Sequence, residues 1–138
     1  MDTNTEYAQK VLKDGGYTLV LYDGKEQITS NERGIKPLLE LYGLGKDISG
    51  FCAADKVIGK AAAFMYVLLG IKEIYCDVIS RPAIAVFEKY GINITYNTLC
   101  DYIINRTKTD MCPMEKTVKD INDAKIAHKA ILEKLKEL

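Results

Sequence analysis

The chain lacks the sequence features of a secreted or membrane protein. No stretch approaches the ~20 apolar residues that a membrane-spanning helix needs, and the most apolar window, 61–71, is about half that length. The first ten residues are polar and acidic, and they contain no apolar core of a signal peptide. We therefore expect a protein of the cytoplasm that does not insert into a membrane.

The chain also lacks an excess of charge of either sign. Lysine plus arginine and aspartate plus glutamate both number 19, so the formal net charge is zero. Domains that bind nucleic acids usually carry a strongly basic face or stripe. We therefore expect no nucleic-acid partner, although net charge says nothing about a small basic pocket.

Cysteine pairs and histidine clusters are missing as well. The four cysteines, at positions 52, 76, 100 and 112, form no C-x-x-C pair, and there is a single histidine. Because the cytoplasm keeps thiols reduced, we expect no disulfide bonds. Cys52 and Cys76 fall in segments expected to be extended, where a cysteine acts as a small buried apolar residue.

What is present predicts one α/β domain over residues 1–138. At this length, with 48% hydrophobic residues, the chain can bury a substantial core. Apolar periodicity and turn residues predict helices at 3–13, 34–42, 56–69, 82–90 and 118–138, and extended segments at 17–22, 48–54, 73–79 and 92–96. Asp23-Gly24 predicts a hairpin after the first of these extended segments. A helix, a hairpin and two helix–strand units indicate a three-layer α/β/α sandwich with a mixed sheet.

The expected C-terminal helix, 118–138, is amphipathic. Its apolar stripe recurs at intervals of three and four and comprises Ile121, Ala124, His128, Ile131, Leu135 and Leu138. A stripe of this kind packs either on the rest of the domain or on a second copy of the chain. The sequence leaves a homodimer open on this ground. It also places the single histidine at a packed position.

Three short segments carry a family resemblance: the run Asp55–Ala63 (DKVIGKAAA), the run Ser80–Val86 (SRPAIAV), and Asn105-Arg106 with the later Cys112–Glu115 (CPME). On these residues the chain resembles an uncharacterised bacterial family, known as a domain of unknown function, whose fold is similar to that of cytidine deaminases. The resemblance covers nearly the whole chain. In zinc deaminases, the first two junctions hold H-x-E and P-C-x-x-C, which place a metal between two helix N-termini.

The resemblance implies the deaminase fold without its metal site. Aligned on Pro82, the two cysteine ligands become Ala83 and Val86, and the H-x-E region reads Lys60-Ala61-Ala62. Zinc needs about three protein ligands to hold an activated water, and the only histidine, His128, lies in the C-terminal helix. We therefore expect no bound metal, no cofactor and no zinc-dependent deamination.

The run after Asp55 has the composition of an anion site. Asp55 suits the N-cap of the expected helix, and Lys56 and Lys60 would share one helix face. Gly59 would cost about 1 kcal/mol inside a helix relative to alanine, so its presence requires a reason. One reason is the close approach of an anionic ligand to the helix N-terminus. The alternative is close packing of Gly59 against a strand, with both lysines in solvent.

Cys112 and Glu115 are the other candidates for chemistry. Cys112 precedes Pro113, which suits the first position of a helix, and the helix dipole would lower the pKa of its thiol. A nucleophilic cysteine normally needs a base beside it, and His128 is the only histidine. We favour the simpler interpretation, in which Cys112 is a cap and Glu115 supports the first turn of its own helix. Arg106 would bind a carboxylate or phosphate, or form an ordinary salt bridge.

Three functions remain open. In the first, a remnant of the deaminase cleft binds a nucleotide-like or anionic small metabolite, with the ligand-binding residues Asp55, Lys56, Gly59, Lys60, Ser80 and Arg106. In the second, the protein is a metal-independent enzyme that uses Lys60, Cys112 or Glu115. In the third, it is a non-catalytic structural or regulatory partner. We favour the first, because the helix-start features persist where the metal ligands are absent.

Overall fold

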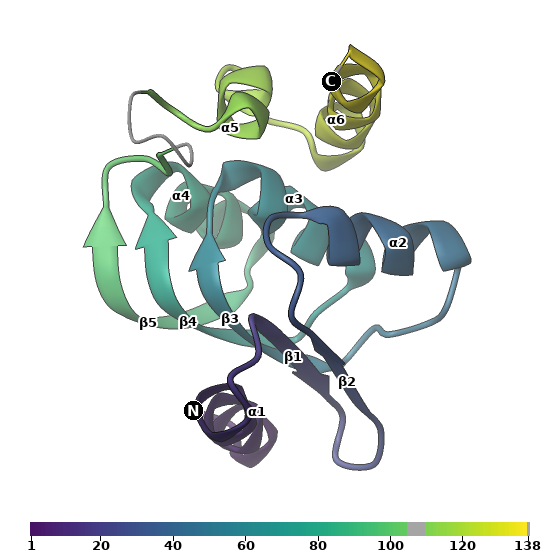
Figure 1. Ribbon diagram of the computed structural model, residues 1–138, viewed down its shortest axis with the longest axis vertical. Coiled ribbons are helices and arrows are strands. Elements are labelled where there is room, and N and C mark those ends of the chain that lie inside the picture. The colour runs from purple at the N-terminus through teal and green to yellow at the C-terminus, as the bar shows by residue number, and fades with distance from the viewer. Residues whose placement is uncertain (105–109, 138) are drawn as a thin grey trace.

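A five-stranded mixed sheet with helices on both faces forms the centre of the computed structural model (Figure 1). The structure describes residues 1–104 and 110–137. The first helix, α1 (Thr3–Gly15), begins at Asp2, whose Oδ1 accepts a hydrogen bond of 2.8 Å from the amide of Asn4. It ends at Gly16, which has a left-handed backbone with φ of 65°.

The predicted hairpin at Asp23-Gly24 is confirmed. Strand β1 (Leu19–Tyr22) pairs in antiparallel fashion with β2 (Gln27–Ser30). The carboxylate of Asp23 accepts hydrogen bonds from two amides inside the turn, and Gly24 has φ of 98°. The local turn chemistry alone therefore determines where the chain reverses.

Two βαβ units complete the sheet. Strands β3 (Cys52–Ile58), β4 (Glu73–Ser80) and β5 (Asn93–Cys100) are parallel, and the strand order is β2-β1-β3-β4-β5. Helix α3 (Lys60–Leu69) connects the first two, and α4 (Arg81–Tyr90) connects the second pair. Because β3 and β4 are parallel neighbours, α3 and α4 begin at the same carboxyl edge of the sheet.

The remaining helices lie around the same face and edge. Helix α2 (Lys36–Leu44) packs beside α3, and α6 (Ala124–Glu137) also packs on α3, whereas α5 (Pro113–Val118) lies beyond the arrowheads of the parallel strands (Figure 1). The carboxyl edge of the parallel strands is therefore covered in part by α5. Among the residues described, no helix has the length and apolar character needed to cross a bilayer.

Two apolar cores, one on each face of the sheet, join the three layers. The larger core lies between the sheet and α2, α3, α4 and α6, and its largest fully buried side chains include Tyr66, Phe64 and Phe87. The smaller core lies under α1 on the opposite face and consists of Ala8, Leu12, Val20, Ala54 and Tyr75. The predicted α/β/α sandwich with a mixed sheet is confirmed. Cys52 and Cys76 are buried, as expected of small apolar residues.

Several predicted boundaries are wrong. The strand expected at 92–96 continues to Cys100, and the extended segment expected at 48–54 forms a strand only from Cys52. The helix expected from Lys56 begins at Lys60, because the parallel ladder between β3 and β4 continues through Val57 and Ile58.

The helix expected at 118–138 begins only at Ala124, as α6, and residues 119–123 separate it from α5, which ends at Val118. Asp123 interrupts the run, since its carboxylate accepts a hydrogen bond of 3.0 Å from the amide of Ile126 and so starts a new helix. The last residue of the expected stripe, Leu138, lies outside the described residues.

Candidate functional site at the carboxyl edge of the sheet

The start of α3 is capped by a carboxylate from a distant part of the chain. Gly59 occupies the N-cap position and has no side chain to accept from the free amides of the first turn. Glu115, from α5, supplies both acceptors: the Lys60 amide donates to Oε1 at 2.5 Å and the Ala61 amide donates to Oε2 at 2.9 Å. Glu115 is only 7% exposed. The anion at this helix N-terminus is thus part of the protein itself.

Gly59 is required for this contact. A Cβ placed on Gly59 would lie 2.3 Å from Oε1 and 2.5 Å from Cδ of Glu115. The backbone of Gly59 is extended, with φ of −100° and ψ of −176°, so its conformation suits any residue. The lack of a side chain at Gly59 therefore allows the Glu115 carboxylate to approach the start of α3. In the structure the Glu115 carboxylate occupies the place where an anionic ligand was expected from the sequence, so that expectation is not supported here, and Gly59 lies before the helix instead of inside it.

Lys60 lies next to Glu115 and is itself buried, at 8% exposure. Its Nζ donates a hydrogen bond of 2.8 Å to the main-chain oxygen of Lys119, in the segment between α5 and α6. The ammonium also lies 5.8 Å from the centre of the Phe64 ring, within the range of a cation–π contact. Lys60 therefore links α3 to the C-terminal cover of the sheet edge.

Burial shifts both charged groups toward their neutral forms. Desolvation raises the pKa of the Glu115 carboxyl, against the opposing effect of the two amides and of Lys60. Desolvation likewise lowers the pKa of Lys60, partly offset by the carboxylates of Asp120 and Glu115. The nearby carboxylates offset only part of the cost of burying the Lys60 ammonium, so a further anion beside it would be favourable.

A small cavity of about 110 Å³ adjoins Lys60, between α3, α4 and the segment 119–123. Its walls are Lys60, Phe64, Pro82, Ala85, Val86, Lys89 and Asn122. The ammonium of Lys89 donates to the main-chain oxygen of Asn122. Two lysines from two helices thus donate to one stretch of main chain, and the apolar side chains of Phe64 and Val86 also line the cavity.

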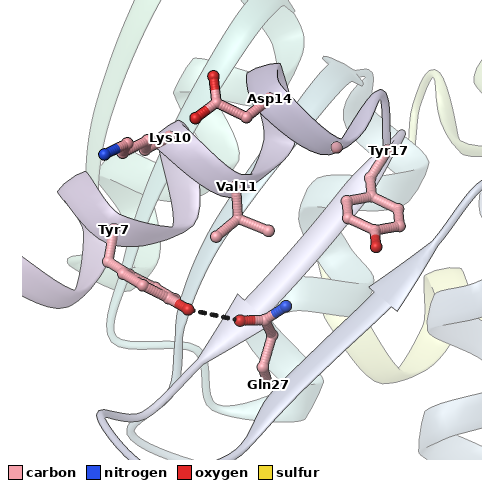
Figure 2. A pocket seen from close by; sticks show the side chains of 7 residues that line it. Tyr7, Lys10, Val11, Asp14, Tyr17 and Gln27 are labelled. Carbon is pink, nitrogen blue, oxygen red and sulfur yellow. Dashed lines mark hydrogen bonds between the residues drawn. The ribbon is translucent and has the colours of Figure 1, made fainter.

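A larger hollow of about 400 Å³ lies elsewhere, between α1 and the β1–β2 hairpin (Figure 2). The hydroxyl of Tyr7 donates to Oε1 of Gln27 at 2.9 Å across it. Val11 points toward the hairpin, whereas the charged ends of Lys10 and Asp14 point away from it (Figure 2). This hollow contains none of the residues singled out by the sequence, and it offers no converging charges.

Asp55 and Lys56 lie in β3, so the prediction of a helix N-cap at Asp55 is wrong. The carboxylate of Asp55 accepts a hydrogen bond of 2.5 Å from the hydroxyl of Tyr66 in α3. Desolvation, reinforced by Asp77, raises the pKa of Asp55 to about 7, although Tyr66 and two nearby amides act in the opposite direction. Lys56 is exposed on the strand and shares no helix face with Lys60.

The raised pKa of Asp55 predicts a pH-dependent stability. In the folded protein Asp55 holds its proton up to about pH 7, whereas in the unfolded chain it loses it near pH 4. Stability from this group is therefore lost as the pH rises through that window. Relative to Asp55→Asn, wild-type stability should fall by about 2 to 3 kcal/mol between pH 5 and pH 8, measured by urea denaturation. Parallel pH profiles of the two proteins would contradict this assignment.

The other predicted site residues are dispersed. Ser80 is fully buried and caps α4, its Oγ accepting from the Ala83 amide at 3.3 Å. Cys112 does sit at the N-cap of α5, but its side chain makes no capping hydrogen bond. His128 packs edge-on against Tyr42, with ring centres 4.8 Å apart, as expected of a packed histidine. Arg106 lies outside the described residues.

The positions aligned with zinc ligands lie within the apolar interior. Ala83 and Val86 are both buried on α4 and carry no ligand atom. Within residues 1–104 and 110–137, no three histidine, cysteine, aspartate or glutamate side chains gather as a metal site would require. The polar groups around Lys60 are instead ammonium groups, the carboxylates of Glu115 and Asp120, and backbone amides.

Comparison with known proteins places the chain in a family. Residues 7–135 match a family described as a domain of unknown function, DUF1893 or TM1506. The chain belongs to the DUF1893 family. No protein in the set of curated sequences matches it. The expected membership in a family of unknown function is therefore confirmed.

A solved structure of the same family agrees with this assignment. The crystal structure of a DUF1893 family protein (TM1506) from Thermotoga maritima is 28% identical and has a TM-score of 0.88, over 97% of this chain and 91% of that chain. A diaminohydroxyphosphoribosylaminopyrimidine deaminase/5-amino-6-(5-phosphoribosylamino)uracil reductase from Thermotoga maritima is 14% identical, with a TM-score of 0.44, over 69% of this chain and 35% of that chain.

Sequence reasoning missed three parts of this DUF1893 site. It placed Glu115 in its own first turn, and it did not consider Lys89 or Asn122. A signal for Glu115 exists only once the helix is known to begin at Lys60: Gly59 then provides no capping side chain, so an acceptor must come from elsewhere. No local signal identifies which residue provides it. The convergence of Lys60 and Lys89 depends on how α3 and α4 pack.

Proposed function

We propose that this DUF1893 protein binds a small anionic metabolite in the cavity beside Lys60. The observation that carries the proposal is the convergence of the Lys60 and Lys89 ammonium groups on residues 119–122. Both groups donate to main-chain oxygens there, which are weaker partners for an ammonium than a phosphate or carboxylate oxygen. An anion in the cavity would provide the stronger partner.

The size of the cavity limits the ligand. Pockets that enclose a whole drug-sized molecule measure roughly 300–1,000 Å³, and this cavity measures about 110 Å³. It accommodates one anionic group, such as a phosphate or carboxylate, with a small apolar portion against Phe64 and Val86. The remainder of a nucleotide-like ligand would extend outside it.

The proposed site differs from the one expected from the sequence. The N-terminus of α3 already holds the Glu115 carboxylate, so the anion would contact the side chain of Lys60 instead of the free amides. Of the ligand-binding residues expected from the sequence, Lys60 alone among those described lines the cavity. Lys89 and Asn122, which were not expected from the sequence, also line the cavity.

Binding of simple anions tests the proposal. Isothermal titration at low salt with inorganic phosphate, acetate and cytidine monophosphate should give saturable binding of at least one probe. Lys60→Met and Lys89→Met should each weaken it roughly 10- to 100-fold, because each removes a charge-assisted hydrogen bond. Methionine preserves most of the apolar contact of the lysine stem.

Lys136→Met is the matched control, because Lys136 is exposed on α6, away from the cavity lining. This variant should bind the probes as the wild type does. Equal weakening by Lys136→Met would indicate nonspecific attraction, and absence of saturable binding to the wild type would refute the proposal.

The metal-independent enzyme hypothesis has less support from the described residues. Cys112 has no hydrogen bond from its Sγ to a described base, and His128 packs on Tyr42. Glu115 is engaged by two amides at the start of α3. Neither arrangement resembles an activated nucleophile with its base.

A further inference from the structure

The hollow between α1 and the β1–β2 hairpin has the size of a small-molecule site. Its volume of about 400 Å³ falls within the roughly 300–1,000 Å³ that is usual for such pockets. The residues that line it belong to α1, to the turn after α1 and to β2. Because α1 covers the face of the sheet opposite to α3 and α4, this hollow is separate from the anion site beside Lys60.

Two tyrosine rings form the ends of the hollow. Tyr7 and Tyr17 lie at its two ends, with the side chain of Val11 between them (Figure 2). The ring of Tyr7 is held in place by Tyr22, since the two ring centres are 4.2 Å apart. Tyr22 is not among the residues that line the hollow, so it supports Tyr7 from the other side. Aromatic rings beside an apolar residue favour contact with a flat ring, which stacks on them.

Gly15 allows Tyr17 to take its position. Gly15 is the last residue of α1 and is not among the glycines with a left-handed backbone. Alanine would be the better helix former at such a position. A Cβ on Gly15, however, would lie 2.3 Å from Cε2 and 2.6 Å from Cδ2 of the Tyr17 ring. The glycine therefore lets this ring lie against the end of the helix and form one wall of the hollow.

The amide of Gln27 provides a polar group with a fixed orientation. Its Oε1 accepts the hydrogen bond from Tyr7, and its Nε2 donates to no other group among the described residues. Lys10 and Asp14 also line the hollow, but their charged ends point away from the hairpin (Figure 2). An oriented amide donor without a converging charge suits an uncharged partner that carries a hydrogen-bond acceptor.

We propose that this hollow binds an uncharged planar ring that carries a carbonyl group, or a similar acceptor, at its edge. The ring would lie against Tyr17 and Val11, and its acceptor would receive a hydrogen bond from Nε2 of Gln27. The hollow is open to solvent on one side, so the rest of a larger ligand would extend outward. Aromatic amides and neutral heterocyclic bases have this chemistry.

Nicotinamide is the test probe, because it is neutral and planar and carries one amide. Titration followed by NMR amide shifts should show saturable binding with a dissociation constant of about 1 mM. The shifts should be confined to residues 7–17 and to β2. Cyclohexanecarboxamide carries the same amide on a ring that is not planar, so it should bind about 5-fold more weakly.

Three substitutions test the two walls and the donor. Tyr17→Leu should weaken binding of nicotinamide about 10-fold, because it removes the stacking surface. Gly15→Ala should weaken it in the same direction by displacing the Tyr17 ring, without lowering the melting temperature, because the displaced atoms belong to the end of a flexible side chain. Gln27→Glu retains the acceptor for Tyr7 and loses the free donor, so binding should weaken roughly 3- to 10-fold.

Tyr96→Leu is the matched control, because Tyr96 is a tyrosine 42% exposed on β5, outside the hollow. This variant should bind nicotinamide as the wild type does. The wild type should also bind it equally well in the presence of phosphate, and so should Lys60→Met, so the result does not depend on the anion site.

Three outcomes would overturn the proposal. The first is an absence of saturation at about 10 mM nicotinamide. The second is equal affinity for cyclohexanecarboxamide, or unchanged affinity in Tyr17→Leu, since either would show that no ring stacks on Tyr17. The third is a set of amide shifts at residues 60–64 and 85–89, which would place the probe in the cavity beside Lys60 instead.

Discussion

Glu115→Ala should lower the free energy of unfolding by about 3 to 5 kcal/mol, measured by urea denaturation at pH 7. The change removes both acceptors from the first turn of α3 and leaves the amides of Lys60 and Ala61 without a partner in the protein interior. It also removes a carboxylate from the positive end of the helix dipole.

Two variants calibrate this loss. Glu115→Gln retains one acceptor oxygen in nearly the same shape, so it should lose about half as much stability. Glu133→Ala, at an exposed position of α6, should change the stability by less than about 0.5 kcal/mol. If Glu115→Ala were no more destabilised than Glu133→Ala, the capping contact would have no energetic role.

Gly59→Ala should cost about 2 to 4 kcal/mol, because the new Cβ displaces the Glu115 carboxylate from the two amides. The three atoms nearest to that Cβ all belong to Glu115. In the Glu115→Ala background the obstacle is gone, so the same substitution should cost less than about 0.5 kcal/mol. The double-mutant cycle measures this coupling directly.

Gly43→Ala is the control for the intrinsic effect of replacing glycine. Gly43 lies inside α2, and an added Cβ meets no atom within 4 Å. This substitution should raise the stability by about 0.5 to 1 kcal/mol, since alanine restricts the unfolded chain and favours helix. An equal penalty for Gly59→Ala with and without Glu115 would show that Glu115 is not what requires the glycine.

Elements with strong local signals were predicted well. Asp23-Gly24 marks the hairpin, and Pro82 and Gly91 mark the two ends of α4, where Pro82 is the second helical residue and Gly91 has φ of 72°. The β-branched run before Ser80 marks β4. Each of these signals acts on its own backbone within a few residues, so no knowledge of the fold is needed to interpret it.

The boundary near Asp55 shows where local signals fail. Asp55 has the chemistry of an N-cap, and a helix from Lys56 agreed with the apolar run that follows. The chain remains extended to Ile58 because β4 provides a parallel partner up to Ile79. A contact between strands outweighs a local capping preference, since it supplies several main-chain hydrogen bonds at once.

The sequence by itself determined the order of the strands and of every helix except α5, the α/β/α layers, and the absence of ligand atoms at Ala83 and Val86. It also marked Gly59 as a position that requires a reason. Only the tertiary structure decided that the reason is Glu115, 55 residues from Lys60, and that Lys60 and Lys89 converge on one cavity. Those facts depend on how α5 covers the sheet edge and how α3 packs on α4. Such contacts arise from the burial of apolar surface shared by distant segments, which leaves no periodic or local pattern in the sequence.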